Sequence, residues 1–281
     1  MRLIRSLLFA PANRPDMLKK FPKYPADAVV IDLEDGTPEN EKTTAREHLP
    51  DVVAYLKEQH LKSMLFVRTN APRSHQIKAD VTVALSISID GIVVPKLEAP
   101  VDLQMFEGSM PIIGIIETAR GVTNVEVLLA QQSGRLSALA FGAEDFVTDI
   151  GGRRTPEGLE VLYARSRVVL AARVGGLQAL DQVFTGIKDH DAFRRDAELA
   201  RQLGFGGKMC ITPRQVEIAN EVFSPSAEEV DRSRRLIHAY EVAQSEGRGV
   251  IEFEGCMVDE PLLKRAHAVL QLAGEFSDES R

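Results

Sequence analysis

Residues Met110 to Asp149, MPIIGIIETARGVTNVEVLLAQQSGRLSALAFGAEDFVTD, contain two apolar runs that each end at a carboxylate. Glu117 follows the first run, Ile112 to Ile116. The second run, Leu136 to Phe141, is followed by Gly-Ala-Glu and then by Asp145. A helical pattern lies between the runs, so the segment predicts a strand, a helix and a strand, a crossover that joins parallel neighbours. We therefore expect Glu117 and Asp145 to lie side by side at one edge of a sheet.

These two carboxylates are candidate metal ligands. Carboxylates at adjacent strand ends repel each other unless a cation lies between them. Proteins hold Mg²⁺ through one or two carboxylates, with water and substrate oxygens completing the coordination. We therefore predict a Mg²⁺ site at Glu117 and Asp145. The alternative is that both are solvated loop carboxylates or helix caps, which is the commoner role of a single acid at a strand end.

Eight short apolar runs with helical patterns between them predict the fold. The runs are continuously apolar, as expected of parallel strands that are covered on both faces. This pattern favours a (β/α)₈ TIM barrel. A doubly wound open sheet is the alternative, but no G-x-G-x-x-G motif follows the first run. The runs are Leu3 to Phe9, Ala28 to Leu33, Met64 to Arg68, Gly91 to Pro95, Ile112 to Ile116, Leu136 to Phe141, Ala179 to Phe184, and Lys208 to Ile211.

The chain continues after the eighth run. We predict a catalytic barrel domain at residues 1–223 and a C-terminal helical extension at 224–281, which packs on the barrel or on a neighbouring subunit. A capping box between Ser226 and Glu229 predicts the start of a long helix. A short β-like run, Val250 to Phe253, and a last helix follow it.

Composition limits the classes of partner. The 281 residues are 44% apolar and carry a formal charge of −7, which disfavours a nucleic acid or an anionic membrane as the main partner. Two cysteines provide no disulfide framework, and no run approaches membrane-spanning length. We expect a cytoplasmic protein. The six histidines have no paired spacing, and no G-x-S-x-G or phosphate-loop motif occurs, so zinc, serine hydrolase and P-loop chemistry are disfavoured.

Other polar residues follow the predicted strands, where TIM barrels place their catalytic groups. Arg68 ends an apolar strand, and a planar bidentate donor is the residue type that fixes a carboxylate. Lys96 and Arg14 could instead be solvated surface charges, and Asp35 could cap the next helix. Asn13, beside Arg14, completes this set of strand-end candidates.

Several motifs in the chain, in the same order, resemble those of the citrate lyase β-subunit and CoA-ester lyase family, in the HpcH/HpaI aldolase superfamily. They cover nearly the whole chain. The motifs are Arg5 to Pro11 with Asn13, Asp32 to Asp35, Val67 to Asn70, Pro95 with Lys96, Ile116 to Ala119, Phe141 to Asp145, Tyr163 to Ser166, Ala179 to Asp181, Pro213 to Gln215, and Met257 to Asp259.

The resemblance implies a Mg²⁺-dependent, barrel-shaped lyase that cleaves or forms the carbon–carbon bond of a β-hydroxyacyl-CoA thioester, usually as a homotrimer or hexamer. It implies that Glu117 and Asp145 are the metal ligands and that Arg68 binds substrate. It also implies that Asp259 matches an acid that family members bring over a neighbouring subunit's active site.

The expected chemistry suits these residues. Cleavage releases a 2-oxo acid and a thioester enolate, and Mg²⁺ would chelate the hydroxyl and carboxylate of the future oxo acid. Arg68 would stabilise the enolate or clamp the carboxylate, and Asp259, or Asp35 through a water, would move the proton. The remaining substrate contacts that we expect come from Asn13, Arg14, Lys96, Gly142, which permits close backbone approach, and the amides of Ala143, Glu144 and Asp145.

Three alternatives remain open at this level. The chain could be the β subunit of a citrate lyase complex, acting on citryl-acyl-carrier protein together with α and γ subunits. It could be a malyl-CoA-type thioesterase, or a non-catalytic assembly protein on a degenerate barrel. The acyl group is not fixed by the sequence, and citryl, citramalyl, malyl and branched hydroxyglutaryl thioesters are all candidates.

Overall fold

The structure is a computed structural model that describes residues 2–106, 108, 110–131 and 134–274. The chain divides into two compact units, Met1–Phe223 and Ser224–Arg281, and each is described by itself. In the first unit, eight parallel strands pair in chain order, and β8 pairs with β1 to close a barrel. The strands are β1 Ser6–Pro11, β2 Ala28–Asp32, β3 Met64–Arg68, β4 Gly91–Val94, β5 Ile112–Ile116, β6 Leu136–Phe141, β7 Gln178–Asp181 and β8 Gly207–Cys210.

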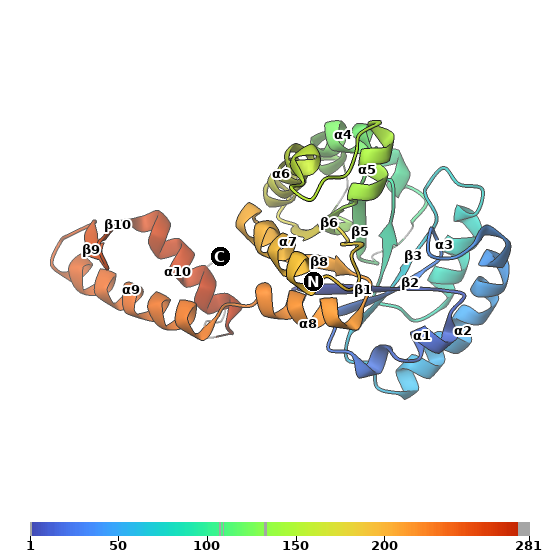
Figure 1. Cartoon of the computed structure of the whole chain (residues 1–281), viewed down its shortest axis with the longest axis horizontal. Helices are drawn as coiled ribbons and strands as arrows, with labels where there is room; N and C mark the ends of the chain where they lie inside the picture. Colours follow the sequence, from blue (N-terminus) through green and yellow to red (C-terminus); the bar gives the residue numbers. More distant parts are fainter. Residues whose placement is uncertain (1, 107, 109, 132–133, 275–281) are drawn as a thin grey trace. The chain divides into compact units, whose positions relative to one another are not determined.

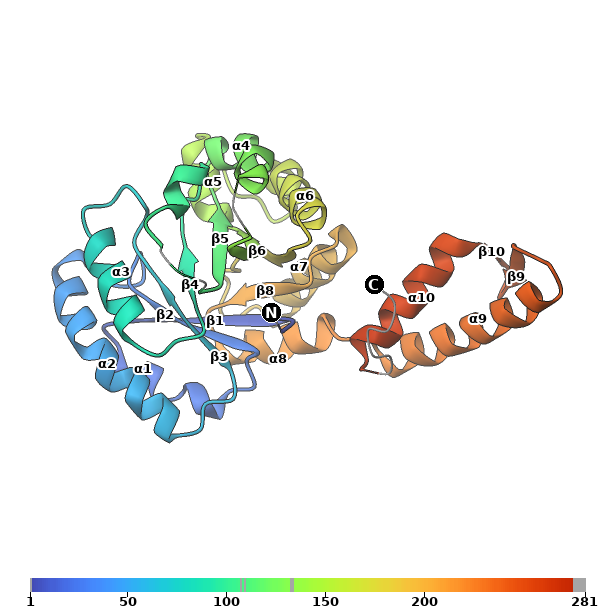
Figure 2. The same ribbon diagram turned by 180° about the vertical axis from the view of Figure 1, so that it is seen from behind.

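Helices surround these strands (Figures 1 and 2). The crossover predicted between β5 and β6 is α4, and α7 ends at Gly204, which adopts the left-handed conformation that glycine favours. The helices are α1 Pro15–Leu18, α2 Lys42–Glu58, α3 Ile77–Ser86, α4 Ala119–Ala130, α5 Ala143–Asp149, α6 Leu159–Val174, α7 His190–Leu203 and α8 Pro213–Val222, with 3₁₀ turns η1 Phe21–Lys23, η2 Glu39–Glu41 and η3 Pro100–Leu103.

The predicted TIM barrel is confirmed, and the largest differences from the expected strand boundaries are three residues, at the start of β1 and at the end of β7. β1 begins at Ser6 instead of Leu3, because the backbone of Ile4 bonds to a side chain and not to a strand. The Gln178 amide group accepts a hydrogen bond from the Ile4 N–H and donates one to the Ile4 carbonyl. β7 ends at Asp181 instead of Phe184, whose carbonyl accepts a hydrogen bond from the Gln215 side chain and not from a strand.

The strands are apolar on both faces because two hydrophobic cores meet at them. Residues such as Leu7, Phe66 and Ile113 fill the barrel interior. A larger cluster, which includes Val29 and Leu139, packs between the strands and the helices. This arrangement explains the long apolar runs in the sequence and places most polar groups at the strand ends.

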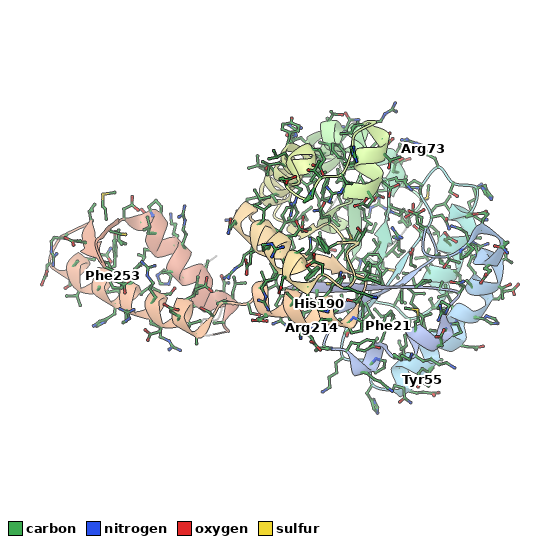
Figure 3. All side chains as sticks on the ribbon, viewed as in Figure 1. Phe21, Tyr55, Arg73, His190, Arg214 and Phe253 are labelled. Carbon is green, nitrogen blue, oxygen red and sulfur yellow. The ribbon has the colours of Figure 1, made fainter. Side chains whose placement is uncertain are left out.

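The second unit contains helix α9 Ala227–Ser245, strands β9 Ile251–Phe253 and β10 Cys256–Val258, and helix α10 Glu260–Leu272. The capping box between Ser226 and Glu229 is present. Phe253 is labelled in Figure 3. The guanidinium carbons of Arg232 and Arg235 lie 5.7 Å and 5.8 Å from the centroid of its ring. None of the described helices combines the length and apolar character needed to cross a membrane.

Candidate active site

A cavity of about 420 Å³ opens where the barrel strands end. Its lining combines charged groups with apolar side chains. Seven of the residues for which the sequence predicts a role line it: Asp35, Arg68, Glu117, Gly142, Ala143, Glu144 and Asp145.

Glu117 is buried at the end of β5. The register pairs Ile116 with Phe141, so Glu117 lies level with Gly142. A Cβ atom on residue 142 would come within 2.2 Å of Glu117 Oε2. Glycine at this position is therefore required by the close approach of the carboxylate, and its φ of −105° is ordinary. The Lys96 amide completes the fixation by donating to Glu117 Oε1 at 2.8 Å.

The electrostatics around Glu117 favour a cation. Burial, followed by the charges of Glu34 and Asp145, raises the pKa of Glu117 to about 8. Burial also raises the pKa of Glu34, although Arg68 and Lys96 oppose that shift. A carboxyl that resists ionisation at neutral pH indicates that the local negative charge is not fully compensated.

Arg68 is held by an ion pair that the strand register sets up. Asp32 and Arg68 are direct partners across β2 and β3. The guanidinium donates from Nε and Nη2 to the two oxygens of Asp32, both at 2.7 Å, and Nη1 lies 2.9 Å from Glu34 Oε2. Burial would lower the pKa of Arg68, but Asp32 and Glu34 raise it, so the group stays charged. A guanidinium has five N–H groups and Asp32 takes two of them in hydrogen bonds, so N–H groups remain for a ligand in the cavity.

Lys96 connects the acids of neighbouring strands. Its Nζ lies 2.9 Å from Glu34 Oε1, 3.2 Å from Asp145 Oδ1 and 3.8 Å from Asp35 Oδ2. Its backbone has φ of 49°, a left-handed conformation that is uncommon for a lysine and that accompanies functional sites. Burial would lower the pKa of Lys96, but Glu34 and Asp145 raise it. Lys96 therefore binds the site's own carboxylates, and it is not among the cavity-lining residues.

We call these residues the mouth cluster: the acids Asp32, Glu34, Asp35, Glu117 and Asp145 and the bases Arg68 and Lys96. The five acids outnumber the two bases, so a divalent cation would offset most of the remaining negative charge of the cluster. In the part of the chain that the structure describes, no three or more His, Cys, Asp or Glu side chains form a metal cage. Glu117 and Asp145 would supply two carboxylates only, which suits Mg²⁺. The residues present therefore fit this ion.

The other predicted residues have different surroundings. Glu144, in the first turn of α5, pairs with Arg154 at 3.0 Å. Asn13 donates to Glu41, and the exposed Arg14 pairs with Asp16, so neither lines the cavity.

Asp259 belongs to the second unit. It precedes α10, and its Oδ1 is buried with no hydrogen-bond partner. Its predicted role in proton transfer stays a prediction.

Sequence reasoning did not identify Asp32 as the residue that organises the site. Besides Arg68, it accepts hydrogen bonds from the amides of Glu34 and Gly36, both at 2.9 Å. Arg68 more than offsets the effect of burial and holds the pKa of Asp32 below its usual range. The signal was present, because Asp32 and Glu34 are two residues apart at a strand end and so face the same side.

A second group of buried charges lies on the opposite side of the barrel. Asp181 and Lys208 are direct partners across β7 and β8. Lys208 Nζ lies 2.5 Å from Asp181 Oδ2 and 2.6 Å from Asp196 Oδ2, and Arg165 binds Asp181 with two hydrogen bonds. We call Arg165, Asp181, Asp196 and Lys208 the sealed cluster. Its two acids and two bases balance, and none of the four lines the cavity.

Known proteins resemble this chain along nearly its whole length. A citrate lyase subunit beta-like protein of Deinococcus radiodurans is 44% identical, with 95% of this chain and 96% of that protein covered. The mitochondrial citramalyl-CoA lyase of Homo sapiens is 33% identical over 98% of this chain and 86% of that protein. The crystal structure of CitE from Mycobacterium tuberculosis in complex with magnesium, acetoacetate and coenzyme A superposes with a TM-score of 0.83 at 30% identity, covering 97% of this chain and 99% of that one.

The family profile described as HpcH/HpaI aldolase/citrate lyase matches residues 5–213, which span the barrel from the start of β1 to the start of α8. Together with the identities above, this match agrees with the family that the sequence motifs indicate. The chain belongs to the HpcH/HpaI aldolase/citrate lyase family.

Proposed function

We propose that the protein is a Mg²⁺-dependent lyase that cleaves or forms the carbon–carbon bond of a β-hydroxyacyl-CoA thioester, giving a 2-oxo acid and an acyl-CoA. The observation that carries this proposal is the convergence of Glu117, Asp145 and Arg68 on one cavity, with more acids than bases around it. Among the relatives named above, the human protein is a citramalyl-CoA lyase, and the CitE structure is a complex with magnesium and coenzyme A.

Glu117 and Asp145 are the residues that we propose to hold the ion. When bound, Mg²⁺ would act as a Lewis acid toward the hydroxyl and carboxylate oxygens of the substrate. Gly142 leaves the space that Glu117 occupies, and the Lys96 amide fixes its orientation, so this ligand is positioned before the ion arrives. A fixed ligand loses little conformational entropy on binding.

Arg68 is the residue that we propose to stabilise charge during cleavage. Asp32 takes two of its N–H groups in hydrogen bonds and Glu34 forms an ion pair with it, so N–H groups remain for the substrate. A guanidinium fixed in this way interacts with a developing enolate or carboxylate without first reorganising, and such preorganised groups contribute several kcal/mol to catalysis.

A proton must leave the hydroxyl and another must reach the enolate carbon. We propose Asp259 as the general acid or base, contributed by a neighbouring copy in a homotrimer or hexamer, with Asp35 acting through a water as the alternative. Asp35 lines the cavity and is well exposed, so it can exchange protons with solvent.

Subunit complementation tests the role of Asp259. We expect Glu117→Gln and Asp259→Asn each to be inactive. If the two residues of one site come from different copies, co-expressed mixed oligomers regain about a quarter of wild-type activity through random assembly. Mixed oligomers without activity would place both residues in the same chain, and an active Asp259→Asn variant would remove Asp259 from the mechanism.

Product analysis tests the proposed function itself. The protein is incubated with citryl-, citramalyl- and malyl-CoA, with and without Mg²⁺, and the released 2-oxo acid and free thiol are measured separately. We expect Mg²⁺-dependent oxo acid, with at least a 10³-fold loss in Glu117→Gln and Asp145→Asn, on the order of 4 kcal/mol. Arg14→Gln is the matched control, because Arg14 pairs with Asp16 outside the cavity.

The rivals give different products. Free thiol without oxo acid would indicate a thioesterase. Activity on citryl-acyl-carrier protein alone, with co-purification of two other subunits, would indicate the β subunit of a citrate lyase complex. Failure to bind Mg²⁺ at millimolar concentration would support a non-catalytic role.

A further inference from the structure

The cavity has two chemically different sides. Around the closed barrel, β2 to β6 and the loops after them contribute the mouth cluster. The next strands, β7, β8 and β1, contribute apolar side chains: Val183 after β7, Met209 and Ile211 at β8, and Phe9 and Pro11 at β1. We call these five residues the apolar arc.

The apolar arc is held firmly. Val183 and Phe9 pack against the apolar cluster that fills the barrel interior, and Met209 belongs to that cluster. Gln215, which is buried, connects two of the strand ends: its Oε1 accepts from the Ile211 amide at 2.8 Å, and its Nε2 donates to the Phe184 carbonyl at 2.9 Å. A wall supported in this way does not rearrange easily to accommodate a charged group.

A carboxylate beside Val183 or Met209 would find no second cation. Arg68 is the one cation among the cavity-lining residues that the structure describes. Its guanidinium carbon lies 5.3 Å from the ring centroid of Phe9, at the β1 end of the arc, and its free N–H groups are the ones proposed to bind the reacting oxygens. Arg154 lies outside the lining and pairs with Glu144 and Glu160. A second substrate carboxylate would therefore lose water without gaining an ion pair, and the acids of the mouth cluster would repel it.

We propose that the apolar arc receives the substituent on the hydroxyl-bearing carbon of the substrate, and that this substituent is hydrogen or methyl and not carboxymethyl. The inference rests on the proposed function, because it assumes that a β-hydroxyacyl thioester binds in this cavity. A methyl group gains contact with Val183 and Met209 and is not repelled by the acids. The preferred substrates are malyl- and citramalyl-type thioesters, and Val183 is a specificity-determining residue.

The reaction on such a substrate balances without a further reactant. The bond between the hydroxyl-bearing carbon and the carbon next to the thioester breaks. The hydroxyl proton passes to a base as the oxo acid, glyoxylate or pyruvate, forms. The electron pair of the broken bond becomes the thioester enolate, which takes up a proton to give acetyl-CoA. A carboxymethyl substituent would give oxaloacetate by the same steps.

The test compares kcat/KM for malyl-, citramalyl- and citryl-CoA with the full-length protein and Mg²⁺. We expect the better of the first two substrates to exceed citryl-CoA by at least about 100-fold, because a buried charge without a partner is rejected strongly. Citryl-CoA cleaved at an equal or higher rate would overturn the inference. It would leave the proposed function intact, since oxo acid would still be released.

Substitution of Val183 examines the residue directly. Val183→Arg places a cation in the apolar arc. It should reduce the ratio of kcat/KM for the best substrate to kcat/KM for citryl-CoA at least about 10-fold. Val183→Met adds length without charge and is the matched control, which should leave citryl-CoA the poorest substrate. An equal change in preference in both variants would show that space and not charge determines the selection, and would overturn the inference.

Binding of products decides the question even without turnover. With Mg²⁺ present, we expect pyruvate or glyoxylate to bind more tightly than oxaloacetate in a calorimetric titration. Tighter binding of oxaloacetate would overturn the inference. If no CoA ester released an oxo acid, the proposed function would fail, and this order of affinities would still show whether the apolar arc rejects a second carboxylate.

Discussion

The mouth cluster and the sealed cluster begin from the same element of structure and differ in what surrounds it. Each is built on an aspartate paired in register with a base on the adjacent strand, Asp32 with Arg68 and Asp181 with Lys208. In the sealed cluster, Arg165 and Asp196 complete a balanced set. Arg165 binds both acids, and Asp196 also pairs with Lys208. In the mouth cluster, four further carboxylates gather with only one further base, Lys96, and a cavity opens beside them.

This difference separates a structural role from a functional one. Buried charges of opposite sign that balance one another compensate their loss of water in the folded protein. Removing one of them leaves the others uncompensated. Burial, together with the neighbouring acids Glu34 and Asp145, raises the pKa of Glu117, so a ligand of the opposite sign is favoured beside it. Substitutions that remove one charge should therefore have opposite effects on stability in the two clusters.

The largest effect on stability should come from the sealed cluster. Lys208→Met removes the ion pairs of Lys208 Nζ with Asp181 and Asp196 and leaves two acids against Arg165. We expect the free energy of unfolding to fall by roughly 3–5 kcal/mol, measured by urea denaturation. Lys264→Met, which breaks the exposed pair with Glu260, should cause no measurable change. An equally small effect of Lys208→Met would contradict the distinction between the clusters.

In the mouth cluster, removal of the Glu117 charge should raise the free energy of unfolding instead of lowering it. Because the pKa of Glu117 rises from 4.5 to about 8 on folding, the folded state keeps a proton that the unfolded chain releases between these values. The stability contributed by this group is therefore highest below pH 4.5, falls as the pH rises toward 8, and is level above it.

Without Mg²⁺, we expect Glu117→Gln to remove this fall. At pH 8 to 9 the variant should be more stable than the wild type by a few kcal/mol, and near pH 4.5 the two should be equal. Urea denaturation at a series of pH values measures both curves. A variant that is less stable at every pH would mean that the carboxylate is compensated in the folded protein after all.

A smaller effect should follow from Gly142→Ala. The added methyl group would meet Glu117 Oε2, and the carboxylate must move. Overpacking of this kind costs about 1–3 kcal/mol, and we expect Mg²⁺ affinity to fall at least about 10-fold because the ligand is displaced. Gly249→Ala is the control, because no atom lies within 4 Å of the added Cβ. Unchanged Mg²⁺ binding in Gly142→Ala would argue against Glu117 as a ligand.

The sequence predicted the barrel and much of the mouth cluster because both depend on local patterns. Continuous apolar runs mark strands covered on both faces, and the first polar residue after each run marks the end where the site forms. Arg68, Glu117 and Asp145 were identified in this way, and all three line the cavity.

The remaining features depend on pairing between strands, which a single run does not encode. The sequence does not show that Asp32 faces Arg68, because the register between β2 and β3 decides it. The positive φ of Lys96 is not marked by a glycine, and the hydrogen bond from its amide to Glu117 joins the ends of two strands, β4 and β5. Asn13 and Arg14 follow β1 as expected, yet hydrogen bonds and ion pairs to Glu41 and Asp16 hold them elsewhere.

Proton release on Mg²⁺ binding shows whether Glu117 is a metal ligand. Calorimetric titration at pH 7 in buffers of different ionisation enthalpy counts the protons released for each ion bound. Because the pKa of Glu117 is about 8, we expect the wild type to release nearly one proton. We expect Glu117→Gln to bind weakly with almost no release. Binding without proton release in the wild type, or equal binding in both proteins, would contradict the assignment of the mouth cluster as the metal site.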